Sequence, residues 1–205
     1  MSRIKVVAFD CDGVMFDSEQ ANTAYYNTIL AHFSLPEMNP GQSAYSHTHT
    51  VDQSLTFLFN DPITLVAAQD YRKTIGYLPF LKHMKIEPTL RSLLDELRPA
   101  YKTAIATNRT DTMHRVLETN DLTGLFDLVV TALDVRNPKP HPEPIRKILD
   151  YFNIKPAEAV YIGDSELDEA AAVAAGVPFV SYRNPELKAE LNIEQLADII
   201  PFLKE

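Results

Sequence analysis

The sequence contains few cysteine or tryptophan residues and no long apolar run. Its 205 residues include one cysteine and no tryptophan. A single cysteine cannot form an intramolecular disulfide, so we expect a reducing compartment, the cytoplasm. The longest apolar stretch, residues 170–180, contains Gly176 and Pro178 and is too short to cross a bilayer. We expect no signal peptide, because the strand-like run Ile4–Phe9 has no small-residue cleavage site after it.

Basic residues are outnumbered as well. The chain has 19 lysines and arginines against 28 acidic residues, a net charge of −9. This balance argues against non-specific binding to nucleic acid or to an anionic membrane. The negative net charge would also repel an anionic substrate, unless a cation makes the electrostatic potential of the binding site positive. With 45% hydrophobic residues, the composition is that of a globular protein, and the length fits one core domain with a large insertion. The sequence makes no prediction of oligomeric state.

Short apolar runs alternate with helical patterns along most of the chain. Leucines at 90, 93, 94 and 97 share one helix face, and apolar residues at 145, 148, 149 and 152 share another. Strands that alternate with helices predict an α/β fold with a Rossmann-like, mostly parallel sheet. The predicted strands are Ile4–Phe9, Thr103–Thr107, Leu128–Thr131, Ala159–Ile162 and Phe179–Tyr182.

Residues 17–85 interrupt this alternation, because no strand pattern is visible there. Apolar residues at helical spacing from Tyr25 to Phe33 predict one helix, and Asp61 followed by proline is typical of the start of another. We therefore expect a small all-helical cap domain at 17–85, inserted after the first strand. The α/β core would then consist of residues 1–16 and 86–205.

Polar residues follow four of the predicted strands. In an open parallel sheet, ligands bind beyond the carboxyl ends of the strands, so these side chains should converge. Four carboxylates at one place repel one another unless a cation is present, and oxygen ligands with open positions suit Mg²⁺. The residues at these strand ends are Asp10, Asp12, Thr107, Asn108, Lys139, Asp164 and Asp168.

This set of residue types suits phosphoryl transfer. A carboxylate can attack phosphorus and form an aspartyl-phosphate. The charge on the transferring group then needs a metal, a cation and fixed hydrogen-bond donors. Lys139 supplies the cation, Thr107 supplies a hydroxyl, and backbone N–H groups after Asp10 and Thr107 supply further donors.

The motifs themselves point to a family. FDCDGVMFDSE at residues 9–19, Thr-Asn at 107–108, Lys-Pro at 139–140 and IGDSELDEAAAVAAG at 162–176 occur in this order. Together they closely resemble the haloacid dehalogenase-like hydrolase superfamily, and in particular its phosphoglycolate phosphatase and β-phosphoglucomutase branch. The resemblance covers the whole core, and that branch carries a helical cap between its first and second motifs.

The resemblance implies four catalytic residues, Asp10, Asp12, Thr107 and Lys139, and Asn108 is a further candidate for binding phosphate. Asp10 would be the nucleophile. Asp12 would be the general acid and base, which protonates the leaving oxygen and then activates the hydrolytic water. Thr107 and Asn108 would bind the phosphoryl group, and Lys139 would neutralise both the nucleophile and the phosphate. The acid at position 12 favours phosphoryl transfer over dehalogenation, since the dehalogenase members lack it.

The resemblance also implies a magnesium site. Asp10 and Asp164 would be ligands, together with the backbone carbonyl of Asp12. Asp168 would be a further ligand or would lie directly behind the ligands.

The expected function is a Mg²⁺-dependent phosphatase that acts on a small phosphorylated metabolite. Two alternatives stay open: a phosphomutase of the β-phosphoglucomutase type and a non-catalytic module that binds phosphate. Thr107-Asn108 looks more like the phosphatase form of the second motif. Substrate identity is not predicted. Tyr45, His47 and His49 in the cap, together with Arg109, are the candidates for substrate contacts, and the two histidines also fit an ordinary polar loop of the cap.

Overall fold

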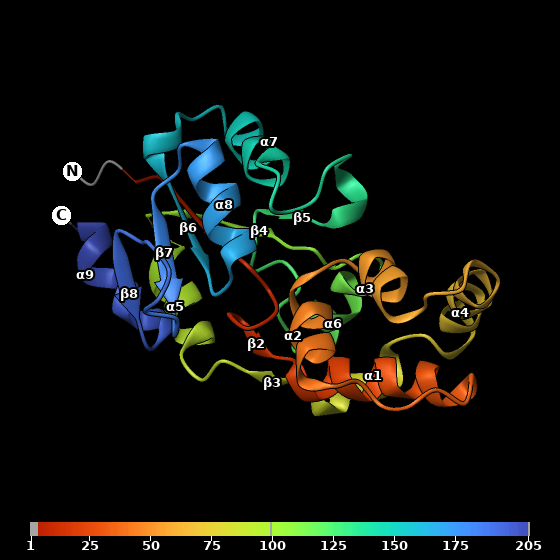
Figure 1. Ribbon diagram of the computed structural model, residues 1–205. Coiled ribbons are helices and arrows are strands. Elements are labelled where there is room, and N and C mark those ends of the chain that lie inside the picture. Colours follow the sequence, from red (N-terminus) through yellow and green to blue (C-terminus); the bar gives the residue numbers. More distant parts are fainter. Residues whose placement is uncertain (1–3, 99, 205) are drawn as a thin grey trace.

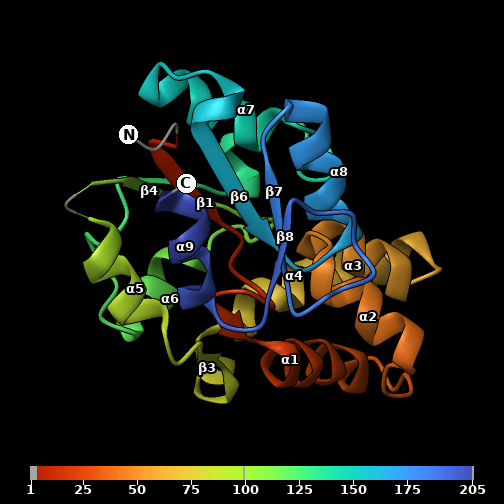
Figure 2. The ribbon, with the colours of Figure 1, turned by 90° about the vertical axis from the view of Figure 1, so that its left-hand side faces the viewer.

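A six-stranded parallel sheet forms the core of the computed structural model, which describes residues 4–98 and 100–204 (Figure 1). The first strand lies in the middle of the sheet (Figure 2). Its two neighbours are the strand at residues 102–106 and the strand at residues 159–163. All neighbouring strands pair in parallel, which confirms the predicted α/β fold. The spatial order is β5 (Leu128–Val130), β4 (Lys102–Ala106), β1 (Val6–Phe9), β6 (Ala159–Gly163), β7 (Phe179–Tyr182) and β8 (Leu191–Ile193).

All five predicted strands are present, and their bounds shift by at most two residues. The edge strand β8 was not predicted. It contains three residues, of which only Ile193 is buried, so it has too little apolar alternation to stand out in the sequence.

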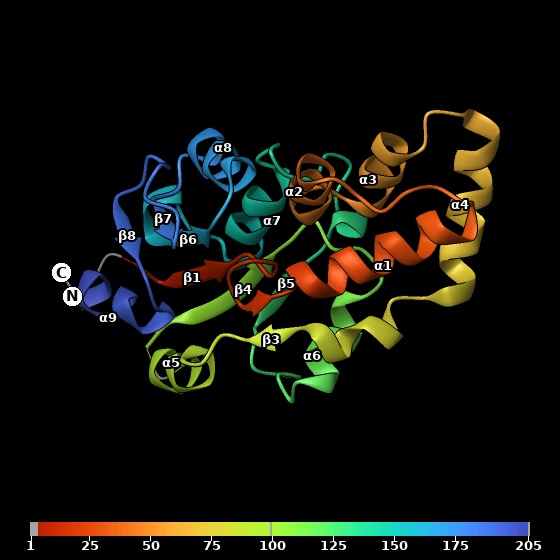
Figure 3. The same cartoon turned by 60° about the horizontal axis from the view of Figure 1, so that its bottom comes forward.

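Helices cover both faces of the sheet (Figure 3). Helices α7 (Glu143–Phe152) and α8 (Glu166–Ala175) pack on one face, and α5 (Leu90–Leu97), α6 (Met113–Thr119) and α9 (Ile199–Lys204) pack on the other. A hydrophobic core fills the space between the sheet and the helices on each face. Side chains alternate along β1, so Val6 and Ala8 pack into the core on one face, and Val7 and Phe9 pack into the core on the other. Short 3₁₀ helices lie at Leu78–His83, Ala132–Asp134, Pro156–Glu158 and Leu196–Asp198.

Four helices form the segment beside the core. They are α1 (Glu19–His32), α2 (Pro40–Thr48), α3 (Val51–Leu58) and α4 (Pro62–Ile75). Asn39, Thr50 and Asp61 cap the starts of α2, α3 and α4, because each side chain accepts a hydrogen bond from a first-turn amide. Gly76 ends α4 with a φ of 60°. Among the described helices, none has both the length and the apolar character that crossing a membrane requires.

A two-stranded ribbon joins the helical segment to the core. Strands β2 (Phe16–Asp17) and β3 (Lys85–Ile86) pair antiparallel, with Phe16 opposite Ile86 and Asp17 opposite Lys85. The sequence showed no strand here, because two residues are too few for a periodic pattern. The domain boundaries expected from the sequence fall within this ribbon, and we propose it as the hinge of the cap.

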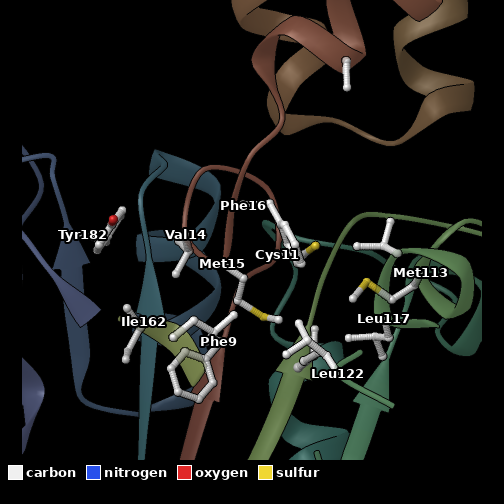
Figure 4. Close-up of a cluster of buried hydrophobic side chains, with 14 of the residues drawn as sticks. Phe9, Cys11, Val14, Met15, Phe16, Met113, Leu117, Leu122, Ile162 and Tyr182 are labelled. Atoms are coloured by element: carbon white, nitrogen blue, oxygen red, sulfur yellow. The ribbon is translucent and has the colours of Figure 1, made fainter. Parts of the chain in front are cut away.

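The segment after β1 sends alternate side chains to opposite sides. Cys11 is fully buried in an apolar cluster with Phe9, Met15 and Met113 (Figure 4). Burial raises the pKa of the Cys11 thiol well above its ordinary value, which disfavours the reactive thiolate. Asp10 and Asp12, on either side of it, line a cavity under the cap instead.

Candidate active site

The cavity lies where the carboxyl ends of β1 and β4 meet the helical segment. Its volume is about 60 Å³, which is room for only a few water-sized atoms. The core contributes two acids, Asp10 and Asp12, and the run 107–112 after β4. The helical segment contributes Asn22, Tyr25, Tyr26, Ser46, His47, Thr48, His49, Val51, Arg72 and Tyr77. The structure therefore encloses the predicted nucleophile between core and cap.

Lys139 is the central cation of the site. Its Nζ lies 2.7 Å from Asp10 Oδ1 and 2.6 Å from Asp168 Oδ1, and only 2% of the residue is exposed. Burial alone would lower the pKa of Lys139, but the two carboxylates outweigh it and raise the pKa above its ordinary value. The lysine is therefore charged, and it cancels part of the negative charge of the two carboxylates.

Asp168 holds this lysine from behind. Its Oδ1 accepts a hydrogen bond from Lys139, and its Oδ2 accepts from the backbone N–H of Ser165 at 3.2 Å and from the Ser165 hydroxyl at 2.5 Å. Ser165 is the N-cap of α8, and its own hydroxyl oxygen accepts from the Asp168 amide. This reciprocal capping box fixes the Asp168 carboxylate at the start of the helix.

The hydroxyl of Tyr161 completes the group around Lys139, and Tyr161 was not among the residues predicted for the site. The hydroxyl accepts from Lys139 Nζ at 3.0 Å and lies 2.9 Å from Asp168 Oδ1 and 2.8 Å from the carbonyl oxygen of Ala106. Tyr161 is fully buried. A polar aromatic residue in an otherwise apolar central strand was the available signal, since a buried tyrosine hydroxyl needs a partner.

Three carboxylates form a group that can hold a metal ion. Asp10, Asp164 and Asp168 each place one oxygen within 4.8 Å of the others. Burial, followed by the charges of neighbouring acids, raises the pKa of Asp164 well above its ordinary value, and burial raises that of Asp10 to about 7 against the attraction of Lys139. Within the described chain, no hydrogen bond reaches the Asp164 carboxylate. A divalent cation would supply the missing partner and relieve the repulsion.

Two glycines let these acids approach. A Cβ on Gly13 would lie 2.0 Å from Asp164 Oδ2, and Gly13 has a φ of +81°, which favours glycine. A Cβ on Gly163 would lie 2.3 Å from the Cβ of Asp168. The glycines of both motifs therefore provide the space that the carboxylate cluster occupies.

Thr107 and Asn108 follow β4 but play different parts. Thr107 is 1% exposed, lines the cavity, and its hydroxyl oxygen accepts from the Arg109 amide at 3.1 Å. The Asn108 side chain accepts from the Lys139 amide at 3.0 Å and donates to the carbonyl oxygens of Lys139 and Thr48, both at 3.1 Å. The side-chain amide of Asn108 therefore ties the Lys139 loop to the end of α2, and the phosphate contact expected of Asn108 could come only from its backbone N–H.

Asp12 is paired with Arg109. Arg109 Nε donates to Asp12 Oδ2 at 2.7 Å and Nη2 donates to Oδ1 at 2.6 Å, and Ser18 also donates to Oδ1. Burial alone would raise the pKa of Asp12, but the pairing with Arg109 lowers it below its ordinary value. Arg109 was only a candidate from the sequence, because its partner lies 97 residues away in the chain.

A chain of polar contacts continues from Arg109 into the cap. Arg109 Nη2 lies 3.3 Å from the hydroxyl of Tyr77, which donates to Asn22 Oδ1 at 2.5 Å. Asn22 Nδ2 lies 3.1 Å from His47 Nδ1. These contacts connect Asp12 in the core to α1 and α2 in the cap. The sequence did not indicate Asn22 or Tyr77, since an isolated polar residue on a helix, such as Asn22 on α1, or in a connection, such as Tyr77 after α4, is usually solvated.

The cap candidates separate into two groups. His47 and His49 line the cavity, whereas Tyr45 stacks between the rings of His49, with centroids 3.7 Å apart, and Phe57, with centroids 4.2 Å apart. The alternative of a polar loop is wrong for His47, because helix α2 extends through Thr48.

Comparisons with known proteins agree with the motifs. Residues 7–182 match the model of the haloacid dehalogenase-like hydrolase family. A Bacillus pumilus protein named pyrophosphatase PpaX is 33% identical over 184 residues, which cover 85% of this chain and 81% of that protein. The structure of a subfamily IA hydrolase from Geobacter sulfurreducens has 40% identity and a TM-score of 0.81, with 98% of this chain and 97% of that chain covered.

A more distant structure shares the fold. That of β-phosphoglucomutase from Clostridium difficile has a TM-score of 0.86 and 19% identity, over 98% of this chain and 96% of that chain. The match of the family model covers most of the sequence, including each of the four motifs. The chain therefore belongs to the haloacid dehalogenase-like hydrolases, the enzyme family that its motifs predicted.

Proposed function

We propose that this enzyme is a Mg²⁺-dependent phosphatase that hydrolyses a small phosphorylated metabolite through an aspartyl-phosphate on Asp10. The observation that carries the proposal is the ion pair between Asp10 and the buried Lys139 beside a small cavity between core and cap. A carboxylate held there faces an entering phosphoryl group, and the lysine offsets the repulsion between the two anions. The relatives named as pyrophosphatases make pyrophosphate one candidate substrate.

Asp10 and Asp164 are the residues that would hold magnesium, together with the backbone carbonyl of Asp12. We place Asp168 behind them, because both of its oxygens already accept hydrogen bonds from Lys139 and Ser165. When bound, magnesium stabilises the negative charge on the phosphoryl oxygens. The donor set fits this ion, since carboxylate and carbonyl oxygens are the ligands that it prefers.

The residues of the chain account for both chemical steps. Asp10 attacks phosphorus while Lys139 and the Thr107 hydroxyl bind the phosphoryl oxygens. Asp12 donates a proton to the leaving oxygen and then takes one from the water that cleaves the aspartyl-phosphate. Arg109 binds both oxygens of Asp12 and lowers its pKa, so Asp12 must release at least one of these contacts and take up a proton from water before it can donate one to the leaving oxygen.

The cap excludes bulk water from these steps. It closes over Asp10 through α1, α2 and α4, and its contact with the core includes the hydrogen bond from Asn108 to Thr48. A small cavity under the cap limits the substrate to a compact molecule and shields the aspartyl-phosphate from bulk water. The net charge of −9 supports a small metabolite rather than nucleic acid, and the single buried cysteine fits a cytoplasmic setting.

Hydrolysis of an aryl phosphate, measured with and without Mg²⁺, tests the proposal. We expect wild-type enzyme to require the metal and Asp10→Asn to lose at least 1,000-fold in kcat, about the size of a lost catalytic nucleophile. Asp70→Asn is the matched control, because Asp70 is exposed and lies outside the cavity. Equal activity of Asp10→Asn and wild type would refute the mechanism. Formation of glucose 6-phosphate from β-glucose 1-phosphate, without phosphate release, would favour the mutase.

A further inference from the structure

The cap wall of the cavity carries two buried polar atoms that lack a hydrogen-bond partner among the described residues. Ser46 on α2 is 3% exposed, and Arg72 lies on α4. Within residues 4–98 and 100–204, neither the Ser46 hydroxyl nor Arg72 Nε has a hydrogen-bond partner. Both residues line the cavity that contains Asp10 and Asp12. Buried polar groups are almost always hydrogen-bonded, so these two point to a ligand that enters the cavity.

Arg72 is also poorly neutralised. Its Nη2 lies 3.4 Å from Asp52 Oδ1, and the Asp52 side chain is 65% exposed, so solvent weakens this pair. Arg109, by contrast, binds both oxygens of Asp12. The cap thus presents a cation whose charge is available to the cavity.

The other charges in the cavity restrict where an anion can sit. Asp12 and Asp111 both line it, and Asp111 is exposed and bonded to the Thr110 hydroxyl at 3.0 Å. These carboxylates repel an anion that is not next to a cation. The phosphoryl group belongs beside Lys139, which leaves Arg72 as the place for a second negative group.

We propose that Arg72 and Ser46 bind an oxyanion on the leaving group, so that the substrate is a small phosphate ester or anhydride with a second negative group. This inference rests on the phosphatase function proposed above. The guanidinium donates to a carboxylate or a phosphate alike, and the serine hydroxyl donates one further hydrogen bond. The small cavity allows only a few atoms between the phosphoryl group and the second anion.

Three substrates test the proposal in the presence of Mg²⁺. Phosphoglycolate carries a carboxylate, pyrophosphate carries a second phosphate, and 2-hydroxyethyl phosphate is the neutral counterpart of phosphoglycolate. We expect wild-type enzyme to prefer at least one anionic substrate over the neutral one by 10-fold or more in kcat/KM. Arg72→Gln should reduce this preference about 10- to 100-fold, the range expected for hydrogen bonds between charged groups.

The neighbouring Lys73 provides a matched control. Its side chain is 65% exposed and pairs with Asp70 outside the cavity, so Lys73→Gln should keep the wild-type preference. Ser46→Ala should reduce the preference less than Arg72→Gln does, and it serves as the second variant if Arg72→Gln does not fold. Preference for the carboxylate or for the phosphate identifies which oxyanion the site takes, and either one supports the proposal.

Two results would overturn this assignment: equal kcat/KM of the wild type for all three substrates, or an unchanged preference in folded Arg72→Gln. Both results are distinct from failure of the proposed phosphatase function. If the protein were not a phosphatase, the wild type would release no phosphate from any of these three compounds or from the aryl phosphate.

Discussion

The ion pair between Asp12 and Arg109 should make a large, measurable contribution to stability. The two side chains are only 13% and 6% exposed, so water cannot replace the pairing when one partner is removed. Two unit charges about 4 Å apart interact by about 4 kcal/mol at an effective dielectric constant near 20. Breaking a buried pair costs about 3–5 kcal/mol in measured cases, which agrees with this value. We expect Arg109→Met to lower the free energy of unfolding by this amount at pH 7.

A double-mutant cycle separates the pair from other effects. Asp12→Asn also leaves a buried charge, so it should cost a similar amount, whereas the double variant contains neither charge and should regain most of the loss. The assay is urea unfolding followed by circular dichroism, in EDTA, for the wild type and the three variants. A coupling energy below about 0.5 kcal/mol, the usual error of additivity, would refute the assignment of the pair as a strong buried interaction.

The pH dependence of the same measurement has a definite sign. Arg109 lowers the pKa of Asp12 in the folded state below its ordinary value of 3.8. The contribution of the pair is therefore fully present above pH 3.8 and is lost as the pH falls through the lower folded-state pKa. In Arg109→Met, burial raises the pKa of Asp12, so a proton relieves the unpaired charge. The stability gap between the wild type and this variant should narrow as the pH falls from 7 to 4.

Three further changes have defined outcomes. Gly13→Ala should reduce phosphatase activity at least 10-fold, because the new Cβ would displace Asp164. It should also lower the free energy of unfolding by about 1–2 kcal/mol, because the φ of residue 13 is positive. Activity equal to that of the wild type would show that glycine is not needed at this position. Tyr161→Phe should lower the free energy of unfolding by about 1–3 kcal/mol in a thermal or urea melt, since the partners of its buried hydroxyl each lose a hydrogen bond. The kcat should also fall, because Lys139 loses a contact that positions its Nζ. Leu94→Ala, in the fully buried face of α5, should cost about 2–5 kcal/mol without changing KM, and a cost below 1 kcal/mol would contradict the packing described here.

Local pattern was sufficient for five of the six strands of the sheet and for the convergence of the motifs, but not for the short strands β2, β3 and β8. The apolar alternation of β1 and the leucine spacing of α5 are visible within about ten residues, so they predict a strand and a helix without tertiary information. The general rule that parallel strands present their carboxyl ends at one edge then predicts that Asp10, Lys139 and Asp164 meet. The structure places these three side chains around one site.

The tertiary structure alone decided which of these side chains contact one another. The Arg109–Asp12 pair spans 97 residues, and no local periodicity encodes a contact over that distance. The Asn108 side chain binds the backbone of the Lys139 loop, and the Tyr161 hydroxyl binds the Lys139 side chain. Local sequence does not predict these two contacts, because they depend on how β4, β6 and the loops pack together. The sequence by itself therefore determined the fold, the family and the acidic cluster, since local periodicity and motif order encode them. Only packing between distant segments decided how the acid at position 12 is paired and which polar groups of the cap face the cavity.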